Sequence, residues 1–496
     1  MSPQSFYYIF LLLPAALVAF GLARRWSGAG LALGCLLSAS LIAYAAERPE
    51  ALAVVAFSCL FNYWLALRLA GARQRGRDGQ AWLVVGVLAN LGLLAWFKYR
   101  DFLWATLGPW LGEGADAARM ALLPLGISYF TFQQIAYLVD IQRGMAPESS
   151  ILRYVAFVTF FPKIIAGPIV RPHELLPQLS SARLGFLSHR ALAQGLTLFL
   201  LGLAKKTLLA GTLAPFADHA FGMAAEGGVP DLAQAWGGVL AYSLQLYFDF
   251  SGYSDMAIGA ARMFGLRLPS NFNSPYRSLN ISDFWRRWHM SLSRWLRDYL
   301  YIPLGGSRKG KGRRHLNVMI TMLLCGLWHG TGWGFMVWGG LHGLFLVGHD
   351  LWRARAILRP GSACWPPPAW RAWAARLLTF LTVSLAWVFF RAQDLTAAGN
   401  MLCGLAGAGG MPVSRGTLVF MAWHLACGLF VAWLLPEAEQ YVLGRPGGGN
   451  QTAQDHPPLQ PAWRPRPSHL LLALILGLWA LGRLASGASQ FLYYQF

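Results

Sequence analysis

Long apolar runs recur through most of this chain and limit what it can fold into. The hydrocarbon core of a bilayer is about 30 Å thick, so a helix needs about 20 mostly apolar residues to cross it. Runs of roughly this length occur at 6–23, 31–46, 51–70, 81–97, 121–139, 155–170, 191–210, 232–250, 318–347, 374–390, 417–435 and 470–484. The sequence therefore predicts an all-α polytopic membrane protein with about 11 transmembrane helices, some of them broken or re-entrant.

The composition excludes a soluble domain of any size. The chain is 56% hydrophobic and 12% charged, whereas soluble domains carry roughly 25% charged residues. We expect one membrane-embedded domain over 1–496, with Gly- and Pro-rich loops near 355–373 and 436–467. The six cysteines form no C-x-x-C pair, so we predict neither a disulfide framework nor a metal site.

The net charge of +20 is concentrated between apolar runs. Residues 277–314 hold ten Arg or Lys and two Asp. A basic loop beside spans is typical of a topology signal and of contact with anionic lipids, so we expect membrane lipids and not nucleic acid as the partner. The first run begins almost uncharged and ends at Arg24 and Arg25, which places the N-terminus outside the cytoplasm.

One histidine lies inside the longest uncharged stretch. His329 falls in the apolar run from Leu316 to Val347, and no Asp, Glu, Lys or Arg lies between Asn317 and Gly348. An ionisable side chain at that depth is costly and usually functional, and imidazole transfers protons well near neutral pH. The alternative is a histidine that satisfies a backbone carbonyl in a helix bundle. For His342, on the following helix, we favour interhelical hydrogen bonding.

The segment 281–301 has a helical stripe of apolar residues with arginines on the opposite face. This pattern predicts an interfacial helix, with aromatic rings at the lipid boundary and guanidinium groups toward water. Asn280 is suited to cap its start. His289 lies at the edge of the apolar stripe, so we expect it to point inward; the alternative is a packing residue.

Several motifs together give the chain a resemblance to a known family. The matching segments are Leu123–Tyr129, Phe160–Pro168, Tyr247–Asp255, Asn271–Tyr276, Asp283–Ser293 with Arg297–Tyr299, Trp328–Gly330 and Phe491–Phe496. In combination they resemble the membrane-bound O-acyltransferase family, and within it the bacterial alginate O-acetyltransferase type of integral-membrane subunit. The likeness is closest over 85–350.

The resemblance implies a bundle of spans around a central tunnel, with an acyl donor entering from the cytoplasm and an acceptor outside. It assigns catalysis to His329, the histidine of Trp328-His329-Gly330, and the second functional position to His289. Acyl transfer to a hydroxyl needs a base, and His329 is our candidate. His289 would orient the substrate, donate to the oxyanion or share the proton transfer.

Further residues are candidates for substrate contact. Tunnel or substrate contacts are expected at Trp328, Asp255, Tyr253, Arg286 and Arg297. A flexible basic run is a candidate for the phosphates of acetyl-CoA, the alternative being a solvated loop beside lipid; its members are Arg308, Lys309, Lys311 and Arg313. Acetyl-CoA is expected as a substrate, and no cofactor is expected.

These observations lead to a functional hypothesis. The protein would be an O-acetyltransferase of the bacterial inner membrane that moves acetyl from a cytoplasmic donor to an exported polysaccharide such as alginate. A separate periplasmic acetyltransferase is the expected partner. The alternatives are transfer of D-alanine or another acyl group to teichoic acid or peptidoglycan, and a transporter or flippase without chemistry.

Overall fold

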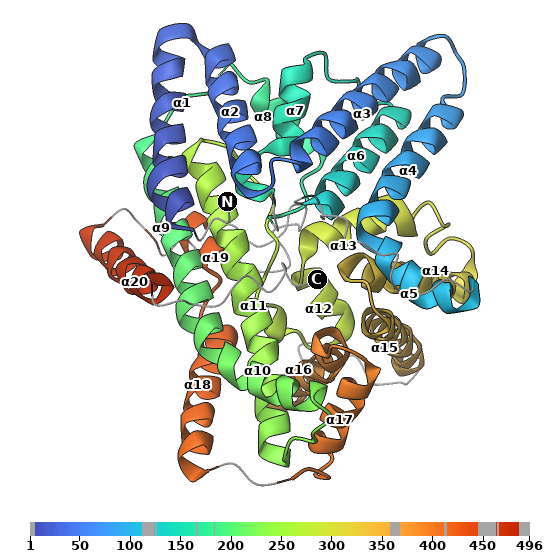
Figure 1. Cartoon of the computed structure of the whole chain (residues 1–496), viewed down its shortest axis with the longest axis vertical. Helices are drawn as coiled ribbons and strands as arrows, with labels where there is room; N and C mark the ends of the chain where they lie inside the picture. Colours follow the sequence, from blue (N-terminus) through green and yellow to red (C-terminus); the bar gives the residue numbers. More distant parts are fainter. Residues whose placement is uncertain are drawn as a thin grey trace. The chain divides into compact units, whose positions relative to one another are not determined.

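The computed structural model describes residues 5–111, 124, 126–164, 167–182, 184–357, 368–410, 414–444, 463 and 466–485, and the regular structure there is helical (Figure 1). The α-helices are α1 (Leu13–Ser27), α2 (Ala29–Glu47), α3 (Ala51–Gln74), α4 (Gln80–Leu94), α5 (Arg100–Leu111), α6 (Ile127–Gln142), α7 (Ile151–Thr159), α8 (Pro172–Leu179), α9 (His189–Ala204), α10 (Gly211–Ala225), α11 (Leu232–Met263), α12 (Ile281–Arg287), α13 (Met290–Leu296), α14 (Gly310–His329), α15 (Trp333–Ile357), α16 (Ala369–Arg391), α17 (Leu395–Leu405), α18 (Arg415–Leu434), α19 (Ala438–Leu443) and α20 (Pro467–Ala485).

The chain folds into two compact units. The first comprises residues 1–201, 253–269 and 464–474, and the second comprises 202–252, 270–463 and 475–496. The boundary falls inside α9, α11 and α20, so each of these helices contributes to both units. The prediction of a single domain over 1–496 stays a prediction.

The predicted membrane character is confirmed, with fewer long spans than the apolar runs suggested. Among the described residues, eight helical segments are long and apolar enough to cross a bilayer, against about 11 predicted. The runs at 121–139 and 155–170 gave helices of only 16 and 9 residues, α6 and α7. The run at 318–347 divides into α14 and α15, because Gly330 is extended and leaves the helix.

Buried polar pairs join the helices of the first unit. α6 packs against both α3 and α4. Between α3 and α4, the Asn90 side-chain amide donates to Asn62 Oδ1 at 2.6 Å, and Asn62 donates back to Asn90 Oδ1 at 3.2 Å. Hydrogen bonds of this kind hold helices together in lipid, where apolar contact alone has little driving force.

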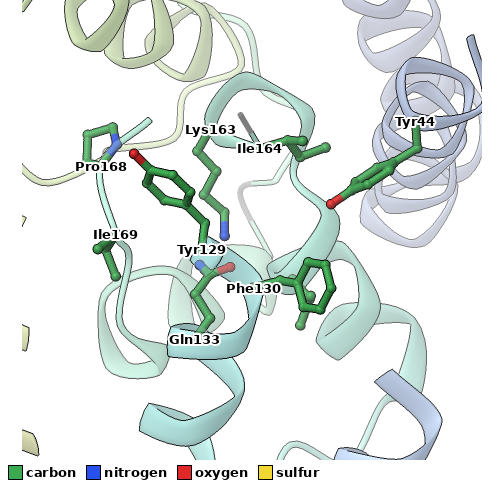
Figure 2. Close-up of a pocket in the computed structure, with 9 residues that line it drawn as sticks. Tyr44, Tyr129, Phe130, Gln133, Lys163, Ile164, Pro168 and Ile169 are labelled. Carbon is green, nitrogen blue, oxygen red and sulfur yellow. The ribbon is translucent and has the colours of Figure 1, made fainter. Parts of the chain in front are cut away.

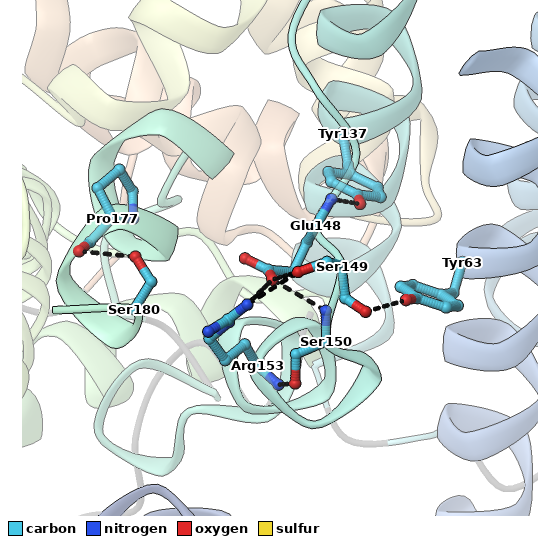
Figure 3. A network of polar contacts seen from close by, with 8 residues as sticks. All are labelled: Tyr63, Tyr137, Glu148, Ser149, Ser150, Arg153, Pro177 and Ser180. Atoms are coloured by element: carbon cyan, nitrogen blue, oxygen red, sulfur yellow. Dashed lines mark hydrogen bonds and ion pairs between the residues drawn. The ribbon is translucent and has the colours of Figure 1, made fainter. Parts of the chain in front are cut away.

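A polar cluster fixes the start of α7 (Figure 3). Glu148 Oε1 accepts from the Ser150 backbone N–H at 3.0 Å and from Arg153 Nε at 2.8 Å, and the Ser150 hydroxyl caps the helix by accepting from the Arg153 N–H. Tyr137 of α6 accepts from the Glu148 N–H, and Tyr63 of α3 donates to the Ser149 carbonyl. These contacts satisfy one N–H group in the first turn of the helix, that of Arg153, and connect α7 to two neighbours.

Two lysines are buried in different settings. Lys206 is 4% exposed and forms an ion pair with Asp249 within the second unit. Lys163 is 3% exposed, and no ion pair between described residues reaches it. Its side chain converges with Tyr129 and Gln133 on a cavity with room for about one water molecule (Figure 2). Burial lowers the pKa of Lys163 well below its ordinary value.

The prediction of one continuous interfacial helix over 281–301 is wrong. The segment forms two helices of 7 residues, α12 and α13, followed by a π-helical turn at Arg297–Tyr301. The break falls at Trp288 and His289, where His289 adopts a left-handed backbone with φ of 43°. The capping prediction is confirmed, since the Asn280 side chain accepts from the Asp283 N–H at 2.9 Å.

The turn between α14 and α15 depends on a close approach. A Cβ on Gly330 would lie 2.1 Å from the ring of Phe335, whereas a Cβ on Gly332 would meet nothing nearer than 3.7 Å. The Phe335 ring packs on Phe390 at 4.9 Å between centroids. A side chain at Gly330 must therefore displace that ring pair.

Some predicted features lie outside the described residues. The closing motif 491–496 falls there, as do most of the predicted loops, at 358–367 and 445–462. Within the predicted loop 436–467, however, residues 438–443 form α19.

Replacing Gly330 with Ala is expected to lower the melting temperature of the purified protein, because the new methyl overlaps the Phe335 ring; overpacking of this kind costs about 1–3 kcal/mol. Gly332→Ala is the matched control. Its free energy of unfolding should lie within about 0.5 kcal/mol of the wild-type value, and its melting temperature should therefore be close to that of wild type. Equal melting temperatures for the two variants would contradict the packing described here.

The two buried lysines are expected to respond in opposite ways to replacement by Met. Lys206→Met removes the ion pair that Lys206 makes with the buried carboxylate of Asp249 and should cost about 3–5 kcal/mol in the free energy of unfolding. Lys163→Met removes a costly buried amine without stranding a carboxylate and should leave stability unchanged or raised. Unfolding in detergent measures both; a large loss with Lys163→Met would show that its amine has a partner.

Candidate functional site

His329 is the last residue of α14 and lies in an aromatic enclosure of the second unit. It is 4% exposed. The rings of Trp338 and Phe390 pack edge-on against it, with centroids 5.2 and 5.4 Å away, and Trp328 lies at 4.9 Å. Because α14 ends at His329, the imidazole is held at a helix C-terminus with the extended Gly330 beside it. Aromatic walls exclude water and present few competing hydrogen-bond groups.

His289 occupies the break between α12 and α13 and is fully buried, as predicted. The edge of Phe250 packs on its ring at 4.7 Å and an interplanar angle of 90°. A non-glycine residue with positive φ is uncommon, and such strain persists only where the surroundings hold it. Burial lowers the pKa of His289 to about 3, because desolvation disfavours the charged ring. The ring is therefore neutral near pH 7.

The hydrogen bonds of Asn271 determine the tautomer of His289. The Asn271 side-chain oxygen lies 3.0 Å from His289 Nδ1 and also accepts from the Ser291 hydroxyl at 2.9 Å and backbone N–H at 3.4 Å. The Ser291 backbone N–H can only donate, so the atom that faces it is the amide oxygen. His289 Nδ1 must then carry the proton, and Nε2 presents its lone pair. Among the described residues, Nε2 is buried without a hydrogen-bond partner.

The two imidazoles lie close together in the second unit. Their ring centroids are 6.1 Å apart, and Trp328 lies 6.1 Å from His289. The structure thus brings together three residues singled out from the sequence, namely His289, Trp328 and His329.

The other predicted site residues differ in exposure and in their contacts. Arg286 is exposed and its Nε donates to the Ser282 carbonyl, while Arg297 is exposed and paired with Asp298 at 2.6 Å. The basic run is exposed around the start of α14, at Arg308, Lys309, Lys311 and Arg313. Tyr253 and Asp255 are buried in the first unit.

His342 has the structural role expected from the sequence. Its Nδ1 accepts from the indole N–H of Trp285 at 3.2 Å, which joins α15 to α12. Its ring also packs at 4.9 Å on Trp338, one of the residues that enclose His329. His342 therefore supports the wall of the site from behind.

Sequence reasoning missed the residues that shape the site around the histidines. Asn271 was quoted within a motif but given no role, and Phe250, Trp338 and Phe390 were read only as apolar. Asn271 follows the apolar run of α11 in a segment with two asparagines, and this was the one available signal. Among the described residues, no group of three or more His, Cys, Asp or Glu side chains is placed to hold a metal ion.

Comparison with known proteins assigns the family. The model of the membrane-bound O-acyltransferase family matches residues 146–386. The chain is 41% identical to the probable alginate O-acetylase of Azotobacter vinelandii, over 76% of this chain and 73% of that protein. It is 40% identical to the peptidoglycan O-acetyltransferase of Helicobacter pylori, over 76% of this chain and 74% of the relative.

A more distant relative has a different named substrate. The teichoic acid D-alanyltransferase of Bacillus subtilis is 26% identical over 79% of this chain and 98% of its own length. With spans, motifs and relatives in agreement, the chain belongs to the membrane-bound O-acyltransferase family and is an O-acyltransferase enzyme embedded in the membrane.

Proposed function

We propose that this protein transfers acetyl from a cytoplasmic thioester, acetyl-CoA, for O-acetylation of an exported polysaccharide, with alginate the first candidate. The observation that carries the chemistry is the pair of buried imidazoles 6.1 Å apart, one of which has an unpartnered ring nitrogen. The acetyl group and the polysaccharide are favoured by the relatives named as alginate O-acetylases, which are 41% identical. The bacterial inner membrane is the proposed location, because a cytoplasmic donor and an exported acceptor meet across it.

The proposed reaction needs one proton acceptor and one leaving group. His329 takes the proton from the acceptor hydroxyl as its oxygen attacks the thioester carbonyl carbon. The C–O bond forms, the C–S bond breaks, and the thiolate recovers the proton from His329. The products are an acetyl ester and a free thiol, and no other reactant is required.

We propose a narrower role for His289 than the sequence left open. With its proton on Nδ1, the neutral ring has only a lone pair at Nε2 and cannot donate to an oxyanion. We propose that Nε2 accepts a hydrogen bond from an O–H or N–H of the substrate and so orients it. This pairing would also satisfy a buried acceptor that is otherwise costly.

The proposal includes a partner protein for the enzyme. The described residues form helices and the segments that connect them, without a large globular domain beside the helices. We propose that a separate periplasmic acetyltransferase receives the acetyl group and completes transfer to the polysaccharide. The surrounding lipid is the other partner, through the eight apolar spans found among the described residues.

A second candidate function is D-alanyl transfer to teichoic acid. It is favoured by the resemblance to the teichoic acid D-alanyltransferase across 98% of that relative. The two reactions use the same base and differ in the acyl group, so the donor distinguishes them. Another alternative keeps acetyl as the transferred group but has peptidoglycan as the acceptor, as in the name of the Helicobacter relative.

Replacing His329 with Ala is expected to lower kcat by about 10²–10⁴-fold, which is the usual contribution of a general base. His289→Ala should have a smaller effect, on the order of tenfold, because one hydrogen bond to the substrate is lost. Labelled acetyl-CoA and purified protein in vesicles give both numbers. His189→Ala, at an exposed position at the start of α9, is the control. Wild-type turnover in a folded His329→Ala variant would end the catalytic assignment.

The donor can be identified by supplying it from one side only. In inverted vesicles that carry the protein and its acceptor, labelled acetyl-CoA added outside, at the cytoplasmic face, should give acetyl ester inside. A D-alanyl thioester should give none. Transfer of D-alanine but not acetyl would select the second candidate function.

A further inference from the structure

An acidic segment in this basic chain is buried against the loop that carries Asn271. Glu437 and Glu439 are 4% and 5% exposed, and they lie between the end of α18 and the first turn of α19. Both are beyond residues 146–386, the part matched by the family model. Buried carboxylates are expensive unless they are fully hydrogen-bonded, so their contacts show what holds them there.

Three donors converge on Glu437 within the second unit. Oε1 accepts from the Tyr247 hydroxyl at 2.5 Å and from the Ser274 backbone N–H at 2.8 Å, and Oε2 pairs with Lys205 Nζ at 3.1 Å. Burial would raise the pKa of the Glu437 carboxyl, but Lys205 and the hydrogen bonds outweigh it and hold the pKa below its ordinary value. The group is therefore a carboxylate at neutral pH.

The residues next to Glu437 hold the same loop, residues 270–277. The Ser270 hydroxyl donates to Glu439 Oε1 at 2.6 Å, and the Gln440 amide donates to Asn273 Oδ1 at 2.6 Å. Segment 437–440 thus contacts the 270–277 loop at three positions. All three lie within three residues of Asn271.

The opposite side of the 270–277 loop holds the break between α12 and α13. The Met290 N–H donates to the Asn271 carbonyl at 2.9 Å, and the Asn273 N–H donates to the Arg287 carbonyl at 3.0 Å. The Asn271 side-chain oxygen also accepts a hydrogen bond from His289 Nδ1. The loop therefore connects the Glu437 carboxylate to the histidine through backbone and side-chain hydrogen bonds.

The residues at the two ends of this hydrogen-bonded connection have strained backbone conformations, which neighbouring contacts must hold in place. Ser274, whose N–H donates to Glu437, has φ of 45°, and His289 has φ of 43°. Among the described residues, these are the two non-glycine positions with positive φ. Conformations of this kind are unfavourable alone and persist only when neighbouring contacts determine them.

We propose that Glu437 is a positioning residue for the acyl-transfer site, acting through the 270–277 loop on Asn271 and hence on the orientation of His289. The inference rests on the proposed function of His289 and extends it to a residue outside the family-matched region. Glu437 touches neither histidine, so its effect is on geometry and not on proton transfer itself.

Glu437→Gln keeps the side-chain volume and removes the charge. It is expected to lower kcat by about tenfold, since a charge-assisted hydrogen bond is replaced by a weaker neutral one, while KM for the acyl donor stays unchanged. Glu226→Gln, at an exposed position after α10, is the matched control and should behave as wild type. Ser270→Ala, which removes one contact to Glu439 without unbalancing a buried charge, should give a smaller fall of the same kind.

A double-mutant cycle separates positioning from general stability. If Glu437 acts through Asn271, adding Glu437→Gln to Asn271→Ala should lower kcat by less than about twofold further. The reason is that Asn271→Ala has already removed the hydrogen bond that orients His289. Fully additive losses, or wild-type kcat in both Glu437→Gln and Ser270→Ala, would overturn the proposal.

Hydrogen exchange tests the connection without relying on activity. In Glu437→Gln, amides of 270–291 should exchange faster than in wild type, whereas α14 should be unchanged. Failure of wild-type protein to transfer any acyl group would refute the proposed function, and the exchange result would still test the link. Unchanged exchange over 270–291 would refute the link even if the enzyme is active.

Discussion

The hydrogen bond between the Asn271 side-chain oxygen and His289 Nδ1 is the contact on which the account of the site depends. It fixes a left-handed residue at a helix break and decides which ring nitrogen carries the proton. Together with the backbone hydrogen bonds from the Met290 N–H to the Asn271 carbonyl and from the Asn273 N–H to the Arg287 carbonyl, it supports the strained backbone at His289 and directs the free lone pair of the ring. The site is therefore shaped by a loop and a broken helix, whereas His329 is placed by the regular end of α14.

Several buried polar groups of this apolar protein follow one rule: each lies where another part of the chain can satisfy it. Asn62 and Asn90 pair between helices, Lys206 pairs with Asp249, and Glu437 receives three donors. Lys163 departs from this rule, because it is buried without an ion-pair partner among the described residues. A buried hydrogen-bond acceptor without a partner costs free energy. Because His289 Nε2 is such an acceptor, a hydrogen-bond donor of the substrate is the natural group to pair with it.

Apolar periodicity was enough to predict the class of fold and the burial of both histidines. A run of apolar residues shows that a segment is buried, but it does not show where a helix stops; hence 318–347 divided at Gly330 and 155–170 gave only the short α7. The predicted helix over 281–301 failed because its stripe is continuous in sequence while Asn271, distant in sequence, holds the break at His289. Contacts of this kind depend on chain segments that no local pattern brings together. The roles of Asn271 and Glu437 could be read only from the folded chain.

The central claim is that the acyl group is transferred at His289 and His329. A structure of the protein with an unreactive thioether analogue of acetyl-CoA tests this most directly. The account predicts the acetyl carbon between the two rings, with a substrate or solvent donor within about 3 Å of His289 Nε2. An acetyl group bound away from both imidazoles, with Nε2 still unpaired, would contradict it.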